Sequence, residues 1–131
     1  MKNRTLHSLW CLSLPVIFLG CDPDSPFSVL IDPPRCSIAS IQKSDASWPQ
    51  PAKISLTVKN GGEATAYDVE CDIKLKSGNT IIDEGIVYFG TLESQESCAE
   101  EAWFMKIATH SEYSTTEYHL FWYDSQGDYH Q

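Results

Sequence analysis

The sequence predicts an all-β fold, a sandwich of about seven antiparallel strands. The first observation is hydropathy that alternates with a period of two along several segments, which is the pattern of half-buried strands. The second is that turn-forming residues separate these segments at regular intervals, as they do in a sandwich. The third is the length of 131 residues, which fits one domain of this kind.

The composition predicts a folded domain with an acidic surface. Apolar residues make up 42% of the chain, which is enough for a core and excludes a wholly disordered chain. The chain has 9 Lys+Arg against 18 Asp+Glu, a net charge of −9. This charge would repel the phosphate backbone of nucleic acid, so we expect no nucleic-acid partner.

Residues 1–20 have the features of an export signal. Lys2 and Arg4 precede a mostly apolar run of twelve residues, 9–20, which contains Pro15. This run is shorter than the roughly 18 to 20 residues that span a bilayer, so we expect the hydrophobic region of a signal peptide and not a transmembrane helix.

The junction Phe18-Leu19-Gly20-Cys21 resembles the lipobox of bacterial lipoproteins. In that family the signal is cleaved before the cysteine and the thiol carries lipid. The resemblance implies that Cys21 is the lipid-attachment site and that the protein lies in the bacterial cell envelope, anchored to a membrane on its periplasmic or cell-surface side. The alternative is an ordinary secretory signal, but that needs a small residue where Phe18 stands.

Residues 21–34 are expected to form a tether between this anchor and the domain. Four prolines lie between residues 22 and 34, with Ser and Asp among them. This composition keeps a chain extended and disfavours a helix. The apolar segment Phe27–Ile31 leaves a second possibility open, a first edge strand.

The strands are predicted from their own patterns. Cys36–Ile41 is the first, and Ile54–Lys59 is the second, ending at a tight turn formed by Asn60-Gly61-Gly62. The third, Tyr67–Lys76, alternates most clearly, so that one dry face carries Tyr67, Val69, Cys71, Ile73 and Leu75. The opposite face, which includes Glu70 and Asp72, is expected to meet water.

The later strands follow after Ser77-Gly78-Asn79. Thr80–Phe89 is the fourth strand, with Gly85 as a bulge or kink. Ala102–Ile107 and Glu117–Tyr123 are the fifth and sixth, and after a turn only Asp128–Gln131 remains for a short closing strand.

The order of strands and turns resembles bacterial immunoglobulin-like modules of the CARDB and FxLYD kind. The residues that carry the resemblance are Val58-Lys59-Asn60-Gly61-Gly62, Ala66–Leu75, Ser77-Gly78-Asn79 and Gly90-Thr91-Leu92. The resemblance implies an immunoglobulin-like β-sandwich over residues 35–131 that serves adhesion or assembly. It brings no catalytic residues, so we expect a binding protein with no cofactor and not an enzyme.

Three cysteines belong to this domain: Cys36, Cys71 and Cys98. An exported domain can form disulfides, so one bridge and one free thiol are expected, and all three pairings are open. Cys71 lies in mid-strand, where a free cysteine behaves as a small buried hydrophobe. The immunoglobulin-like order implies that the first and fifth strands start at the same end of one sheet, which favours Cys36–Cys98. No C-x2-C spacing is present, so no metal site is expected.

The histidines of the domain could act as ligands or as a general base beside Asp124 or Asp128. No motif fixes such a geometry for His110, His119 or His130, so surface histidines are expected. The segment between the two aspartates resembles part of a calcium loop, but it lacks the further acidic ligands of such a loop, and we expect a solvated hairpin.

The sequence predicts that the module binds another protein. With few residues after it, the sixth strand should expose an edge to which a partner or a second copy adds a strand. Alternation places Phe121, Tyr123 and His119 outward at this edge. The alternative is that the tether or Tyr129 folds over it. The alternative function is a carbohydrate-binding module in which Phe121 and Tyr123 stack on sugar rings beside the acidic face of the third strand.

Overall fold

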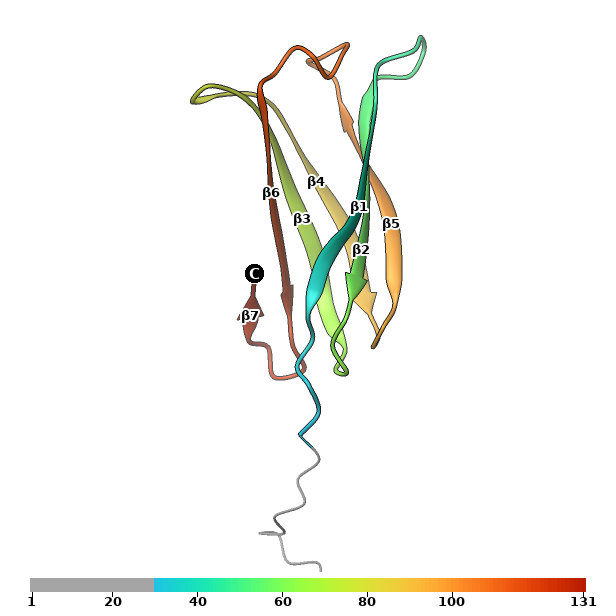
Figure 1. The fold of residues 1–131 in the computed structure, drawn as a ribbon, viewed down its shortest axis with the longest axis vertical. Helices are drawn as coiled ribbons and strands as arrows, with labels where there is room; N and C mark the ends of the chain where they lie inside the picture. Colours follow the sequence, from blue (N-terminus) through green and yellow to red (C-terminus); the bar gives the residue numbers. More distant parts are fainter. Residues whose placement is uncertain (1–29) are drawn as a thin grey trace, which may run out of the picture.

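The computed structural model describes residues 30–131 as two antiparallel β-sheets packed face to face (Figure 1). One sheet has the strand order β1-β2-β5, and the other has the order β4-β3-β6-β7. The strands are β1 (Cys36–Ser44), β2 (Ala52–Asn60), β3 (Ala66–Ser77), β4 (Thr80–Leu92), β5 (Ser97–Phe104), β6 (Thr115–Tyr123) and β7 (Tyr129–His130). The prediction of an all-β sandwich with about seven strands is confirmed.

The predicted signal peptide, the lipid site Cys21 and most of the tether lie outside the described residues. Residues 30–34, the described part of the tether, form no strand, so the alternative of an edge strand finds no support in this part. No helix found between residues 30 and 131 is long and apolar enough to cross a membrane.

The end of the tether is fixed to the β2–β3 loop. The carbonyl oxygen of Asp32 accepts hydrogen bonds from the N–H groups of Glu63 and Ala64 at 3.2 and 3.0 Å. Gly62 has to be glycine because a Cβ there would lie 2.1 Å from the carbonyl oxygen of Pro33. These contacts attach the last residues of the predicted tether to the domain.

The core lies between the sheets and follows from the alternation of apolar residues. In β3, the side chains of Val69, Cys71, Ile73 and Leu75 are fully buried. The other strands contribute the same kind of residue, and together they form one cluster that includes Ile54, Leu56, Val58, Val87, Phe89, Ala102, Phe104 and Trp122. The predicted core face of the third strand is confirmed from Val69 onward.

The first residues of β3 depart from this pattern. The pairing of β3 with β4 shifts register between Ala66 and Val69, and Asp68 has a positive φ of 48°. Because a bulge adds a residue to one strand, the side chains before it change face. Ala66 is therefore buried and Tyr67 is exposed, so the prediction that Tyr67 belongs to the dry face was wrong.

The β2–β3 connection is a longer loop than the tight turn predicted at Asn60-Gly61-Gly62. Asn60 is fully buried. Its Oδ1 accepts hydrogen bonds from the N–H groups of Arg35 and Gly62 at 3.1 and 3.0 Å. Its Nδ2 donates to the carbonyl oxygens of Ala64, Leu92 and Glu93. One side chain thus joins the start of β1, the loop and the end of β4.

Two further details of the strands differ from the prediction. β5 begins at Ser97 and ends at Phe104, whereas the sequence predicted Ala102–Ile107. Residues 97–101 are mostly exposed and include two glutamates, so this part lacks the apolar alternation by which strands are recognised. Gly85 lies in register and forms no bulge; a Cβ there would come within 3.3 Å of Ala102 Cβ and the Phe104 ring.

The three cysteines Cys36, Cys71 and Cys98 are free thiols. As expected, β1 and β5 run in the same direction in one sheet, but β2 lies between them. Two strand spacings amount to about 9.6 Å, which exceeds the roughly 7 Å between Cα atoms that a disulfide can bridge. The expected Cys36–Cys98 disulfide is therefore absent. Burial raises the pKa of Cys36 and of Cys71 to about 11, so both thiols are protonated at neutral pH.

Candidate functional site

The candidate binding surface is the solvent side of the four-stranded sheet, which we call the outer face. Pairing of β3 with its two neighbours arranges its side chains in rows. The first row is Tyr88, Glu70 and Phe121, the second is Ile86, Asp72 and His119, and the third is Glu84, Lys74 and Glu117. Tyr123 and Tyr129 complete the outer face at the end where β6 pairs with β7.

The β4 side of the outer face is apolar and exposed. Ile86 and Tyr88 are 66% and 57% exposed. The hydroxyl of Tyr88 donates a hydrogen bond to Oδ1 of Asp68 at 2.9 Å. This hydrogen bond and the nearby carboxylate charge raise the pKa of Tyr88, so the ring carries no charge at neutral pH. The outer face thus combines exposed apolar groups on β4 with the carboxylates of Glu70 and Asp72 on β3.

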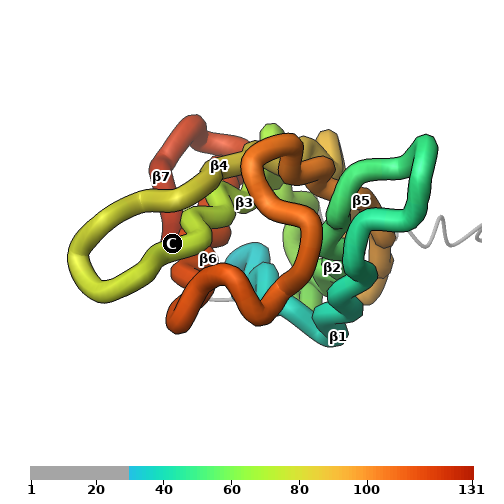
Figure 2. Tube along the Cα trace, turned by 90° about the horizontal axis from the view of Figure 1, so that it is seen from above, coloured from blue at the N-terminus to red at the C-terminus, as the bar shows by residue number. Residues whose placement is uncertain are grey.

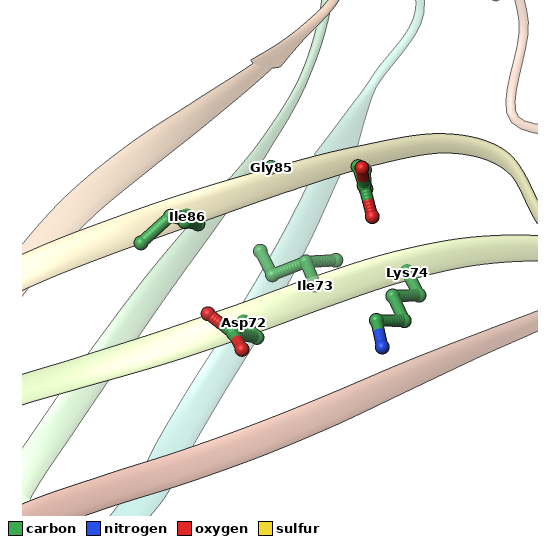
Figure 3. Close-up of a pocket in the computed structure, with 6 residues that line it drawn as sticks. Asp72, Ile73, Lys74, Gly85 and Ile86 are labelled. Atoms are coloured by element: carbon green, nitrogen blue, oxygen red, sulfur yellow. The ribbon is translucent and has the colours of Figure 1, made fainter.

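A groove of about 420 Å³ crosses the outer face between β3 and β4 (Figure 3). Its floor is formed at Ile73 and Gly85, whose side-chain positions face the core. Its rim is formed by Asp72, Lys74, Glu84 and Ile86. Such a groove can accept a side chain from a partner, with an aliphatic contact on one side and charged groups of both signs around it.

The residues predicted for binding lie on β6. Phe121, Tyr123 and His119 occupy alternate positions of the outer face. The rings of Phe121 and Tyr123 both contact Tyr129 of β7, each with a centroid distance of 5.8 Å. His119 is exposed and lies 4.0 Å from Glu117. Tyr129 therefore covers one end of the predicted edge, as the alternative interpretation expected, and leaves the His119 end open.

β7 is fixed in place by Asp124 and His130. Oδ1 of Asp124 accepts the N–H groups of Gln126 and Asp128 at 2.9 Å, and its Oδ2 lies 3.0 Å from Nε2 of His130. The His130 ring also stacks on Trp122 at 5.9 Å. The hydrogen bond with His130 and those from the turn lower the pKa of Asp124. Their stabilising effect is therefore present above the ordinary Asp pKa of about 3.9 and is lost as the pH falls through the lowered pKa.

The β5–β6 loop lies beside the β1–β2 hairpin at the opposite end of the sandwich (Figure 2). His110, in this loop, connects it to the ends of β1 and β2. Its Nε2 lies 3.0 and 3.1 Å from the carbonyl oxygens of Ser44 and Lys53. Both are acceptors, so Nε2 carries the proton, and Nδ1 accepts the hydroxyl of Tyr113 at 2.7 Å. His110 is thus held by structural hydrogen bonds. Between residues 30 and 131, no group of three His, Cys, Asp or Glu residues could hold a metal ion.

Several exposed apolar residues, among them Ile86, Tyr88 and Trp48, were not identified from the sequence. Ile86 and Tyr88 alternate with the buried Val87 and Phe89. A strand of a two-layer sandwich has only one buried face, so two apolar sets in one strand mean that one set faces solvent. That signal was present in the sequence. Trp48, which is 96% exposed in the β1–β2 hairpin, follows no such pattern.

No family model matches the chain, and comparisons with curated proteins and with solved structures give no match.

Proposed function

We propose that this protein is a lipoprotein of the bacterial cell envelope whose β-sandwich binds another protein through the outer face. The observation that carries the binding role is the exposure of Ile86 and Tyr88 beside the carboxylates of Glu70 and Asp72. Adjacent exposed apolar groups with a polar border are typical of protein-interaction sites.

The charge of the domain indicates the kind of partner. The described residues include 7 Lys+Arg and 16 Asp+Glu. Surfaces that associate have complementary potentials, because unpaired like charges oppose contact. The proposed partner therefore presents a basic surface with apolar groups that cover Ile86 and Tyr88. The sequence resemblance supports a module of the CARDB or FxLYD kind that is tethered to a membrane.

The anchor is tested at Cys21. In a bacterial membrane fraction, we expect the intact mass of the protein to correspond to an acylated chain that begins at Cys21. The Cys21→Ser variant should instead be found in the soluble fraction or keep its signal, because the oxygen cannot replace the lipidated thiol. A mature N-terminus at another residue would contradict the anchor and leave the binding role open.

The outer face is tested with a pair of isoleucines. Ile86→Ser should reduce capture of the partner from native membranes about tenfold, because it removes the most exposed apolar contact of the outer face. Ile41→Ser is the matched control, since Ile41 is an exposed strand residue of the other sheet. Both variants should unfold at nearly the wild-type denaturant concentration. Equal capture by both variants would show that the outer face is not the binding surface.

A further inference from the structure

β6 has a long edge that no strand covers among the residues described. β3 pairs with β6 along its length, whereas β7 pairs only with its last two residues. In the turn that joins β6 and β7, the N–H of Asp124 donates to the carbonyl oxygen of Asp128 at 3.0 Å. In an antiparallel pair every second residue makes such bonds, so even-numbered residues of β6 point their backbone groups away from β3. Among these even-numbered residues, Thr116, Tyr118 and Leu120 have no strand paired with their backbone groups on that side.

A cavity lies on this edge, directly beyond the end of β7. Its volume is about 390 Å³, and its lining is Tyr118, His119, Leu120, Tyr129 and Gln131. Tyr118 and Leu120 are half-buried and pack against the core, so they form an apolar wall. The hydroxyl of Tyr118 is buried and has no hydrogen-bond partner in this part of the chain. The cavity thus has room for an apolar side chain of a partner.

At the upper end of the edge, a residue of the other sheet contacts the side chain of Thr116. Nζ of Lys43 in β1 donates to Oγ1 of Thr116 at 3.0 Å and lies 5.0 Å from the centre of the Tyr113 ring. Between this contact and β7, the open part of β6 is residues 116–120. This length suits a short extended segment of about five residues, or about 17 Å of strand.

The net charge of the domain favours a basic segment over a second copy of the chain. Glu117 and His119 are the outward side chains of the open part, and Asp72 lies beside His119 on β3. Lys76 lies 2.7 Å from one oxygen of Glu117, and Lys74 pairs with Glu117 across the strands. The domain as a whole has an excess of acidic residues. A second copy has the same charge, so repulsion opposes self-association through this edge.

We infer that the open edge of β6 binds a basic, extended segment of the partner protein by strand addition. The segment lies antiparallel to β6 and in line with β7. Every second side chain of the segment is apolar and enters the cavity against Tyr118 and Leu120, while Lys or Arg side chains face outward beside Glu117. This inference rests on the proposed function, because it describes how the protein partner is held.

A peptide of eight residues that alternates valine and lysine tests the inference. When the peptide saturates its site on the full-length protein, we expect amide hydrogen exchange at Thr116, Tyr118 and Leu120 to slow at least tenfold. Inward residues of the added strand pair with inward residues of β6, so the valine N–H groups are the donors to β6. N-methylation of the valines should therefore abolish binding, and N-methylation of the lysines should leave it intact.

Two charge reversals provide the matched protein variants. Glu117→Lys should weaken peptide binding at least fivefold, whereas Glu100→Lys, on β5 of the other sheet, makes the same change in net charge and should leave it unchanged. Absence of binding, equal loss with both methylated peptides, or equally tight binding of an alternating valine–glutamate peptide would overturn the inference. Protection at Ile86 and Tyr88 alone would also overturn it, while leaving the proposed binding role of the outer face in place.

Discussion

Val69→Asp is expected to lower the free energy of unfolding by more than about 4 kcal/mol, a large part of the roughly 5–15 kcal/mol that stabilises an ordinary domain. Val69 is fully buried between the two sheets. The aspartate would place a carboxylate among apolar side chains with no partner, and an uncompensated buried charge is among the most destabilising changes known in proteins. Urea denaturation followed by circular dichroism measures the effect.

Glu70→Lys is the control for this substitution, one residue further along β3. Glu70 lies on the outer face between Tyr88 and Phe121, where a longer charged side chain can extend into water. We expect a change of no more than about 0.5 kcal/mol. If the two variants had the same denaturation midpoint, the assignment of the two faces of β3 would be incorrect.

Asn60→Ala should lower the free energy of unfolding by about 3 kcal/mol, although Asn60 lies at a strand end and is followed by two glycines. The substitution leaves the N–H groups of Arg35 and Gly62 without an acceptor and removes the donor to three carbonyl oxygens. Buried polar groups that lose their partners cost about 1–3 kcal/mol each, and entry of water offsets part of this. Thermal denaturation gives the size of the effect, and faster amide exchange at Arg35 and Gly62 gives its location.

Asn79→Ala is the matched control, because Asn79 lies in the exposed β3–β4 turn. Its removal should change the free energy of unfolding by less than about 0.5 kcal/mol. Equal effects of the two alanine substitutions would mean that the Asn60 side chain does not connect the three segments.

The candidate site was predictable in part. The outward positions of Phe121, Tyr123 and His119 follow from the period of two in a strand, which is a local property of the backbone. That Tyr129 packs against two of these rings depends on where the chain returns after the turn, and no local pattern contains this information.

The sequence by itself determined the fold class and the faces of the strands. Alternation in β3 identified Val69, Cys71 and Ile73 as core because successive side chains of an extended chain point to opposite sides, whatever surrounds them. The strand class follows from the same geometry, since a helix would scatter this pattern over its surface.

Only the tertiary structure decided which strands are neighbours and where the alternation is interrupted. Cys36 and Cys98 start strands of the same direction, but β2 separates them, and this order arises from pairing between distant segments. Tyr67 changed face because of a bulge at Asp68. The physical reason is the same in both cases: hydropathy records whether a side chain is buried, whereas strand order and register depend on long-range hydrogen bonds that leave no local signature.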